Sequence, residues 1–249
     1  MAMLPYAAAF DSGIPTFVYN RERIFRRDKN YKFSGAVHEV VTPRGNILYS
    51  DAAIFHKKIK ENEPMRNLRI LQKQIADGVQ LDERQKFYYG RELLFNKMYL
   101  ESAAVLEDFL NGNGWSVNKT EACVNLYQAY KALNDERALP SLLKSFLISP
   151  PSAQVCCILG ENFMDKGEWD SAIYWYNAAL TAPSDEKQGG FFNRDYCGFI
   201  PYMQLCVLYD KKGEYAKAEE YNEMAGKIKP GNVNFLSNKK YFANLKAGK

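Results

Sequence analysis

Apolar side chains recur every three or four residues in paired stretches over the last two thirds of the chain. The clearest pair covers residues 159–179, where the spacing places the apolar side chains on one face of each of two short helices. Gly160 and Ala172 are small enough to let the two backbones approach, and Gly167 supplies the turn between the helices. One such pair cannot bury its apolar face alone, so the pattern predicts a stack of similar pairs.

Four pairs of this kind follow one another between residues 82 and 230. A small residue stands at the equivalent point of each second helix: Ser102, Ala138, Ala172 and Ala218. These positions are 36, 34 and 46 residues apart, and the pairs resemble tetratricopeptide repeats (TPRs), whose period is about 34 residues. Asp82 is the expected N-cap of the first helix. Residues 233–246 predict a final helix that caps the last apolar face.

The first sixty residues have a different pattern, in which short runs of β-branched and aromatic residues alternate with Gly and Pro. The runs predicted as strands are 16–19, 23–26, 36–41, 46–49 and 52–56. A turn is expected at 42–46. So few short strands make a poor independent core, which suggests the edge of something larger. Residues 62–78 predict a connecting helix that turns Leu68, Leu71 and Ile75 inward.

Composition narrows the class of protein without naming its function. Hydrophobic residues make up 47% and charged residues 25%, an ordinary balance for a globular protein. The sequence contains neither a signal peptide nor an apolar run of about 18 residues, so no transmembrane segment is predicted. Five cysteines without a CxxC pair predict a reduced, cytoplasmic protein with no disulfide and no zinc site. They are Cys123, Cys156, Cys157, Cys197 and Cys206.

The only two histidines fall among the predicted strands. His38 precedes Glu39, and His56 ends the last strand run. A base beside a carboxylate could perform acid–base chemistry or hold a metal, although a strand-end histidine is also often only hydrogen-bonded.

A basic cluster lies just before these histidines: Arg21, Arg23, Arg26, Arg27, Lys29 and Lys32. Arginines in such a cluster suit a phosphate or diphosphate, and a solvated strand face is the alternative. No nucleic-acid partner is expected, because strand alternation would divide these charges between two faces and the net charge is only +4.

The order of several motifs is more specific than any one of them. Four segments resemble the C-terminal end of the catalytic domain of family 2 glycosyltransferases: Arg23–Arg27, Phe33–Glu39, Ile47–Asp51 and Ile54–His56. In the bacterial branch of that family with trailing TPRs, segments like Arg66–Leu71 and Phe87–Leu93 come next. The resemblance spans nearly the whole chain, including Tyr202–Val207 and Asn238–Phe242.

This resemblance implies sugar transfer from a nucleotide-diphosphate sugar to an acceptor. It implies that His38 and Glu39 contact the acceptor or act as base, that Arg26 and Arg27 steady the diphosphate, and that His56 approaches the metal. An intact enzyme would use a divalent Mn or Mg ion, whereas this chain alone is expected to hold no cofactor. The chain contains no Asp-x-Asp motif and no upstream βαβ units. We therefore expect a C-terminal fragment that is inactive alone, from a truncated or split gene.

The predicted architecture is mainly α-helical. Residues 1–60 are expected to be a strand-rich remnant of a GT-A-type α/β domain, 61–81 a linking helix, and 82–249 a TPR-like solenoid of about four helix pairs plus a cap. The alternative function is a stand-alone scaffold that binds a peptide or protein partner in its groove. The groove candidates, each of which could equally be a solvated polar residue, are Asn125, Gln128, Glu161, Asn162 and Gln204.

Overall fold

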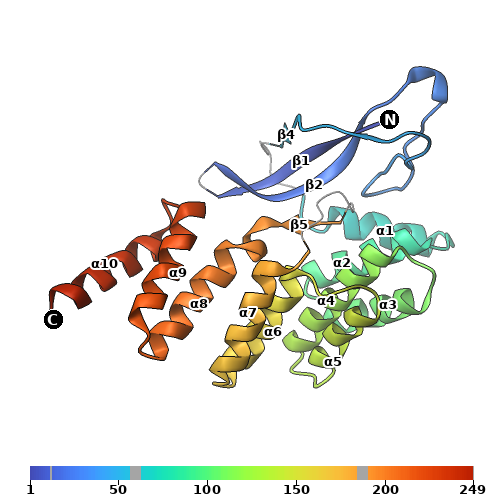
Figure 1. The fold of residues 1–249 in the computed structure, drawn as a ribbon. Coiled ribbons are helices and arrows are strands. Elements are labelled where there is room, and N and C mark those ends of the chain that lie inside the picture. Colours follow the sequence, from blue (N-terminus) through green and yellow to red (C-terminus); the bar gives the residue numbers. More distant parts are fainter. Residues whose placement is uncertain (12, 57–62, 184–189, 249) are drawn as a thin grey trace. The chain divides into compact units, whose positions relative to one another are not determined.

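The computed structural model describes residues 1–11, 13–56, 63–183 and 190–248, and it is mainly helical (Figure 1). The helices are α1 (Arg66–Ala76), α2 (Glu83–Phe95), α3 (Tyr99–Asn111), α4 (Ser116–Ala132), α5 (Ala138–Leu143), α6 (Ala153–Asp165), α7 (Trp169–Thr181), α8 (Phe199–Lys211), α9 (Tyr215–Ile228) and α10 (Val233–Ala247). The strands are β1 (Ala2–Asp11), β2 (Ile14–Ile24), β3 (Leu48–Tyr49), β4 (Ile54–Phe55) and β5 (Phe192–Asn193). Short 3₁₀ helices are η1 (Arg27–Lys29), η2 (Lys144–Leu147) and η4 (Arg194–Cys197).

The described residues divide into two compact units. The first comprises residues 1–6, 19–56, 63–150 and 190, and the second comprises 7–11, 13–18, 151–183 and 191–248. In the first unit α2 packs on α3 and α4 packs on α5; in the second α6 packs on α7, and α8 on α9. Helix α10 then packs on α9. The predicted stack of helix pairs with a terminal cap is thus confirmed, whereas the predicted boundaries at residues 60 and 81 stay predictions.

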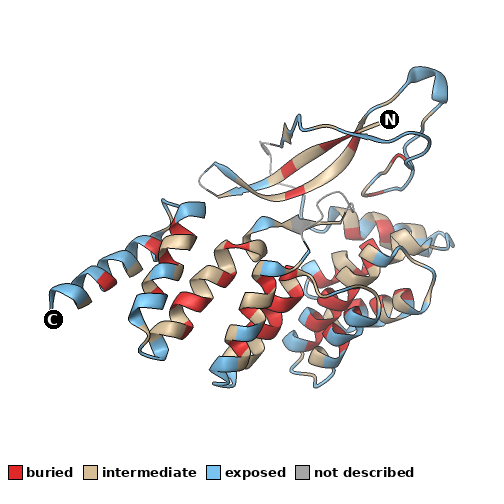
Figure 2. Ribbon diagram, viewed as in Figure 1, coloured by how far each residue is buried: buried red, intermediate tan, exposed pale blue. Residues whose placement is uncertain are grey.

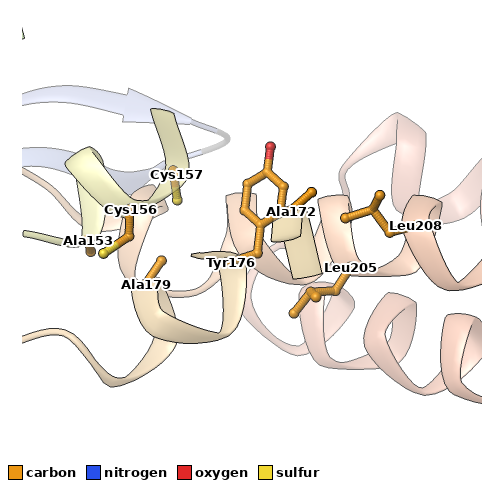
Figure 3. Close-up of a cluster of buried hydrophobic side chains, with 8 residues drawn as sticks. All are labelled: Ala153, Cys156, Cys157, Ala172, Tyr176, Ala179, Leu205 and Leu208. Carbon is orange, nitrogen blue, oxygen red and sulfur yellow. The ribbon is translucent and has the colours of Figure 1, made fainter. Parts of the chain in front are cut away.

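Glycines and other small residues bring the paired helices together. In the second unit, a Cβ added to Gly160 on α6 would lie 2.9 Å from ring atoms of Tyr176 on α7. Figure 3 shows Tyr176 among the buried side chains of this cluster, with Ala172 beside it. In the first unit, the Ser102 hydroxyl on α3 donates a 2.8 Å hydrogen bond to the Gly90 carbonyl on α2. Close approach at a glycine therefore recurs in both units.

The ends of the helices also follow the sequence signals. Asp82 forms a capping box with Gln85: its carboxylate accepts from the Gln85 backbone N–H, and the Gln85 side chain accepts from the Asp82 N–H. Gly167 turns the chain between α6 and α7 at φ +76°, a conformation that favours glycine.

The second helix pair departs from the expected repeat. Ala138 is the first residue of α5 and only half-buried, while Ser141 and Leu142 fill the contact with α4. The helix has six residues and continues as the 3₁₀ helix η2. Figure 2 shows buried segments in red along the helices, separated by intermediate and exposed residues.

The strands follow the order β3-β1-β2-β5, and β4 also pairs with β1. Strands β1 and β3 are parallel, with Ala2 opposite Leu48, and β2 and β5 are antiparallel, with Val18 opposite Phe192. Burial is concentrated in a few side chains, such as Ala7 and Val18.

Several of the predicted strands differ from the structure. The run 16–19 lies within β2, but 23–26 passes the end of that strand, and 46–49 and 52–56 shorten to the two-residue strands β3 and β4. The strand predicted at 36–41 is wrong: only an isolated bridge between Ser34 and Val40 forms there. Gly35 at φ +100° and His38 at φ +53° explain this, because left-handed residues interrupt a strand. Strand β1 was not predicted.

The connecting helix begins later than expected, at Arg66, and residue 62 lies outside the described residues. Leu68 and Leu71 are fully buried as predicted. Ile75 is 42% exposed, so its inward placement was wrong.

The cysteines are free thiols, and all except half-buried Cys197 are buried. Burial raises the pKa of the Cys123, Cys156 and Cys206 thiols to about 11, which keeps them neutral and poorly nucleophilic. In the part of the chain that the structure describes, no helix has the length and apolarity needed to cross a membrane.

Candidate functional site

A polar cavity of about 690 Å³ lies in the first unit, where the loop after β2 meets α1 and α2. Its lining residues are Arg21, Val37, His38, Glu39, Glu63, Pro64, Met65, Arg66, Asn67 and Glu92. The cavity therefore brings the predicted pair His38 and Glu39 together with the first turn of α1 and one residue of α2.

Glu92 is the hydrogen-bonding centre of this cavity. Its Oε1 atom lies 2.7 Å from His38 Nε2 and accepts a 3.0 Å hydrogen bond from Asn67 Nδ2. Burial raises the pKa of Glu92, but the hydrogen bonds from His38 and Asn67 outweigh it and hold the pKa below its usual range. Glu92 is thus an ionised carboxylate that links the loop, α1 and α2.

Further contacts fix the position of His38. Its ring stacks on Tyr88 at 4.2 Å between centroids, with 15° between the planes. The guanidinium carbon of Arg84 lies 4.8 Å from the centroid of the Tyr88 ring. Arg84 also donates a 3.2 Å hydrogen bond to the His38 carbonyl. The left-handed backbone at His38 is therefore held from both its ring and its carbonyl.

The structure pairs His38 with Glu92 and leaves the Glu39 side chain exposed. Glu39 is held through its backbone, where its carbonyl accepts a 2.9 Å hydrogen bond from Arg21. An imidazole oriented by a carboxylate can accept or deliver a proton, and it can equally serve as a structural anchor. Sequence reasoning missed Glu92; the signal was its spacing from Arg84 and Tyr88, which places the three on one side of α2.

The other residues predicted for diphosphate and metal do not line this cavity. Arg26 forms two hydrogen bonds with Asp28, at 3.0 and 2.8 Å, and Arg27 is exposed in η1. His56 is exposed, with its ring 5.4 Å from that of Tyr6. Across the described ranges, no group of three or more His, Cys, Asp or Glu residues could hold a metal ion. These residues therefore do not fit the divalent metal that the resemblance implied.

The predicted groove residues lie on the first helices of their pairs, and each has a different environment. On α4, Gln128 is exposed, whereas Asn125 is buried and its Nδ2 has no hydrogen-bond acceptor among the described residues. On α6, Glu161 is exposed, and Asn162 donates a 2.7 Å hydrogen bond to the Ile158 carbonyl of its own helix. Gln204 on α8 is half-buried.

Comparison with known proteins identifies the fold and no more. No family model matches the chain, and no curated protein matches it. A solved structure of PilF from Pseudomonas aeruginosa is 14% identical and covers 70% of this chain and 72% of its own, with a TM-score of 0.52. A crystal structure of MamA is 22% identical, covers 68% of this chain and 87% of its own, and has a TM-score of 0.49.

YrrB, described as a TPR protein with an unusual peptide-binding site, is 19% identical. It covers 70% of this chain and 81% of its own, with a TM-score of 0.47. The chain has a mainly helical, TPR-like repeat fold preceded by a small strand-containing region, and none of these structures supports a glycosyltransferase origin for that region.

Proposed function

We propose that this chain is an interaction scaffold whose helical repeats bind a peptide or protein partner. The observation that carries the proposal is the stack of helix pairs with a TPR-like fold, since such stacks present extended surfaces for binding. YrrB shares this type of fold and is described as having a peptide-binding site. This interpretation was the alternative in the sequence analysis, and the fold supports it better than sugar transfer.

Gln128 gives the proposal a specific contact, because it is exposed on α4 and can reach a bound peptide directly. Asn125, about one turn earlier on the same helix, has a fully buried Nδ2, so we assign it no direct contact with the peptide. Glu161 is exposed on α6.

Partner capture with a matched control tests this function. The double variant Gln128→Lys/Glu161→Lys should lose a partner that the wild-type chain retains in a pull-down under mild conditions. Gln80→Lys/Glu136→Lys is the control, because it makes the same change of charge at two exposed residues away from the first helices of the repeats. Failure to retain any partner, or equal loss in both variants, would argue against the scaffold.

Binding of a sugar acceptor is a second candidate function, and one observation favours it: His38 and Glu39 line the 690 Å³ polar cavity. Under this proposal the chain supplies the acceptor side of a sugar transferase, with the nucleotide-binding part on another polypeptide segment. Saturation-transfer NMR with a panel of mono- and disaccharides is the test. We expect binding that Glu39→Gln weakens and Glu136→Gln leaves unchanged; no saturable binding by any sugar would reject it.

A further inference from the structure

The loop that follows β2 forms a compact basic lobe, which we define as residues 24–33 together with Arg44. In Figure 1 it is the blue extension that begins where β2 ends and contains η1. The lobe contains five basic side chains and one acidic side chain, a net charge of +4. Since the whole chain also has a net charge of +4, the remaining residues sum to zero.

The lobe has a small aromatic core of its own. The Phe25 ring lies 5.5 Å from that of Tyr31 and 6.4 Å from that of Phe33. The Arg44 guanidinium lies 4.7 Å from the Tyr31 ring centroid, and it also donates to the Lys29 carbonyl. Tyr31 in turn donates a 3.0 Å hydrogen bond to the Arg44 carbonyl. These contacts give the loop a defined shape although it contains little regular secondary structure.

The surface of the lobe exposes apolar and cationic side chains together. Ile24 is 60% exposed and Phe33 is 62% exposed. Arg27, Lys29 and Lys32 are exposed, and among the residues that the structure describes none of the three has a carboxylate within ion-pair distance. Arg26, by contrast, is neutralised locally by Asp28.

We propose that the basic lobe binds the surface of a membrane that contains anionic phospholipids. Apolar side chains that enter the headgroup boundary and cations that remain at the surface are the two contributions to such binding, and the lobe presents both. A nucleic acid would need open aromatic faces on which bases stack. Tyr31 is covered by Arg44 and Phe25, and Ile24 has no ring, so Phe33 is the one strongly exposed ring of the lobe. Successive bases need several such rings, so the lipid surface fits the exposed groups better.

Vesicle co-sedimentation of the full chain tests the proposal. The chain should bind vesicles of phosphatidylcholine with about 30% phosphatidylserine, and bind vesicles of phosphatidylcholine alone weakly, because each Lys or Arg near an anionic surface contributes a factor of about five. Arg27→Glu/Lys32→Glu should then lower the partition coefficient by about 30-fold or more. Phe33→Ser should lower it by about tenfold, the loss of one apolar side chain from the interface.

Two matched variants control for general effects of charge and apolarity. Lys227→Glu/Lys240→Glu makes the same charge change at exposed lysines on α9 and α10, and Leu147→Ser removes a side chain that is 91% exposed on η2. Both should bind like the wild type, and circular dichroism should show all four variants folded. Absence of binding to anionic vesicles, or binding that Arg27→Glu/Lys32→Glu retains, would overturn the proposal. Charge-dependent binding to a DNA oligonucleotide without vesicle binding would overturn it too, since it would assign the lobe to nucleic acid.

Discussion

The helical repeats and the N-terminal strands are held by different kinds of interaction. In the repeats, neighbouring helices meet through apolar side chains, as Tyr176 on α7 packs against Gly160 on α6 in the second unit. The N-terminal region makes polar contacts with residues far away in the sequence. His38 bonds to Glu92 in the first unit, 54 residues away, and Asp11 bonds to Lys229 in the second, 218 residues away.

The two regions therefore differ in the interactions that stabilise them. A repeat gains mainly from apolar area and packing density, which salt and pH change little. The N-terminal region is stabilised by a few ionised groups, such as the pairs His38–Glu92 and Asp11–Lys229. We therefore expect its contribution to the free energy of unfolding to depend on pH. The following substitutions test that contrast, from the largest expected effect to the smallest.

Phe87→Ala should cause the largest loss of stability. Phe87 is fully buried on α2, with its ring 5.5 Å from that of Phe109 on α3. Truncating a buried phenylalanine leaves a cavity and costs about 4 kcal/mol, measured by urea unfolding. Phe95→Ala on the same helix is the control, since Phe95 is 61% exposed and should cost less than about 1 kcal/mol. Equal losses would show that α2 is not anchored through its apolar face.

Lys229→Met tests the buried ion cluster of the second unit. Lys229 Nζ lies 2.8 Å from Asp11 Oδ2 and 2.7 Å from Asp195 Oδ2, and the lysine side chain is only 7% exposed. The variant leaves two carboxylates without their cation, so we expect a loss of about 3 kcal/mol at neutral pH. The exposed Lys227→Met is the matched control.

The same cluster should respond to alkaline pH. Burial lowers the pKa of Lys229, but the hydrogen bonds to Asp11 and Asp195 outweigh it and raise the pKa above the usual lysine value. A raised pKa stabilises the fold fully below the unfolded value of about 10.5, and this contribution is lost as the pH rises through the folded pKa. The difference between wild type and Lys229→Met should therefore shrink above that pH; a constant difference would contradict an electrostatic role.

Gly160→Ala should destabilise the second unit by about 2 kcal/mol, because its Cβ would lie 2.9 Å from the Tyr176 ring. The clash opposes the gain in helix propensity of about 1 kcal/mol that alanine normally brings. Gly231→Ala, where the added Cβ meets nothing within 4 Å, is the control and should be nearly neutral. A stabilising Gly160→Ala would refute close packing of α6 and α7 at this point.

Glu92→Gln should have the smallest effect, about 1 kcal/mol at pH 7. Its lowered pKa means that the ionised carboxylate stabilises the fold above the unfolded value of about 4.5. That contribution is lost as the pH falls through the folded pKa. The charges and donors that face it are His38, Asn67 and Arg91. Unfolding curves between about pH 3 and 7 should become flatter in the variant, and an unchanged pH profile would show that Glu92 does not hold the loop electrostatically.

The sequence predicted the repeat region well because its signals are local. Asp82 and Gln85, which form the capping box of α2, are three residues apart. Gly167, with its positive φ, is itself a residue of the turn between α6 and α7. The prediction for Ala138 was wrong, because Ala138 begins α5 and the buried small residue of that helix is Ser141, three positions later.

The strand region was harder to predict. Strand β1 includes Ala7, Ala8 and Ala9, which are poor strand formers, and its conformation follows from pairing with β2, β3 and β4. The predicted strand around His38 failed because a left-handed backbone there is fixed by Tyr88 and Arg84, neither of which is near it in sequence.

His38 and Glu39, which the sequence singled out as a pair, both line the candidate cavity, and their chemical role stays a prediction. The pairing of His38 with Glu92 was not predicted, because adjacent residues of a loop need not point toward the same partner.

The sequence by itself determined the helix pairs and their stacking, since hydrogen bonds within a helix and apolar spacing along it depend on residues three or four positions apart. Only the tertiary structure decided which carboxylate holds His38, which cation holds Asp11, and how the basic lobe is shaped around Phe25 and Tyr31. Those contacts join residues with no periodic relation in the sequence, so only the folded chain brings them within bonding distance.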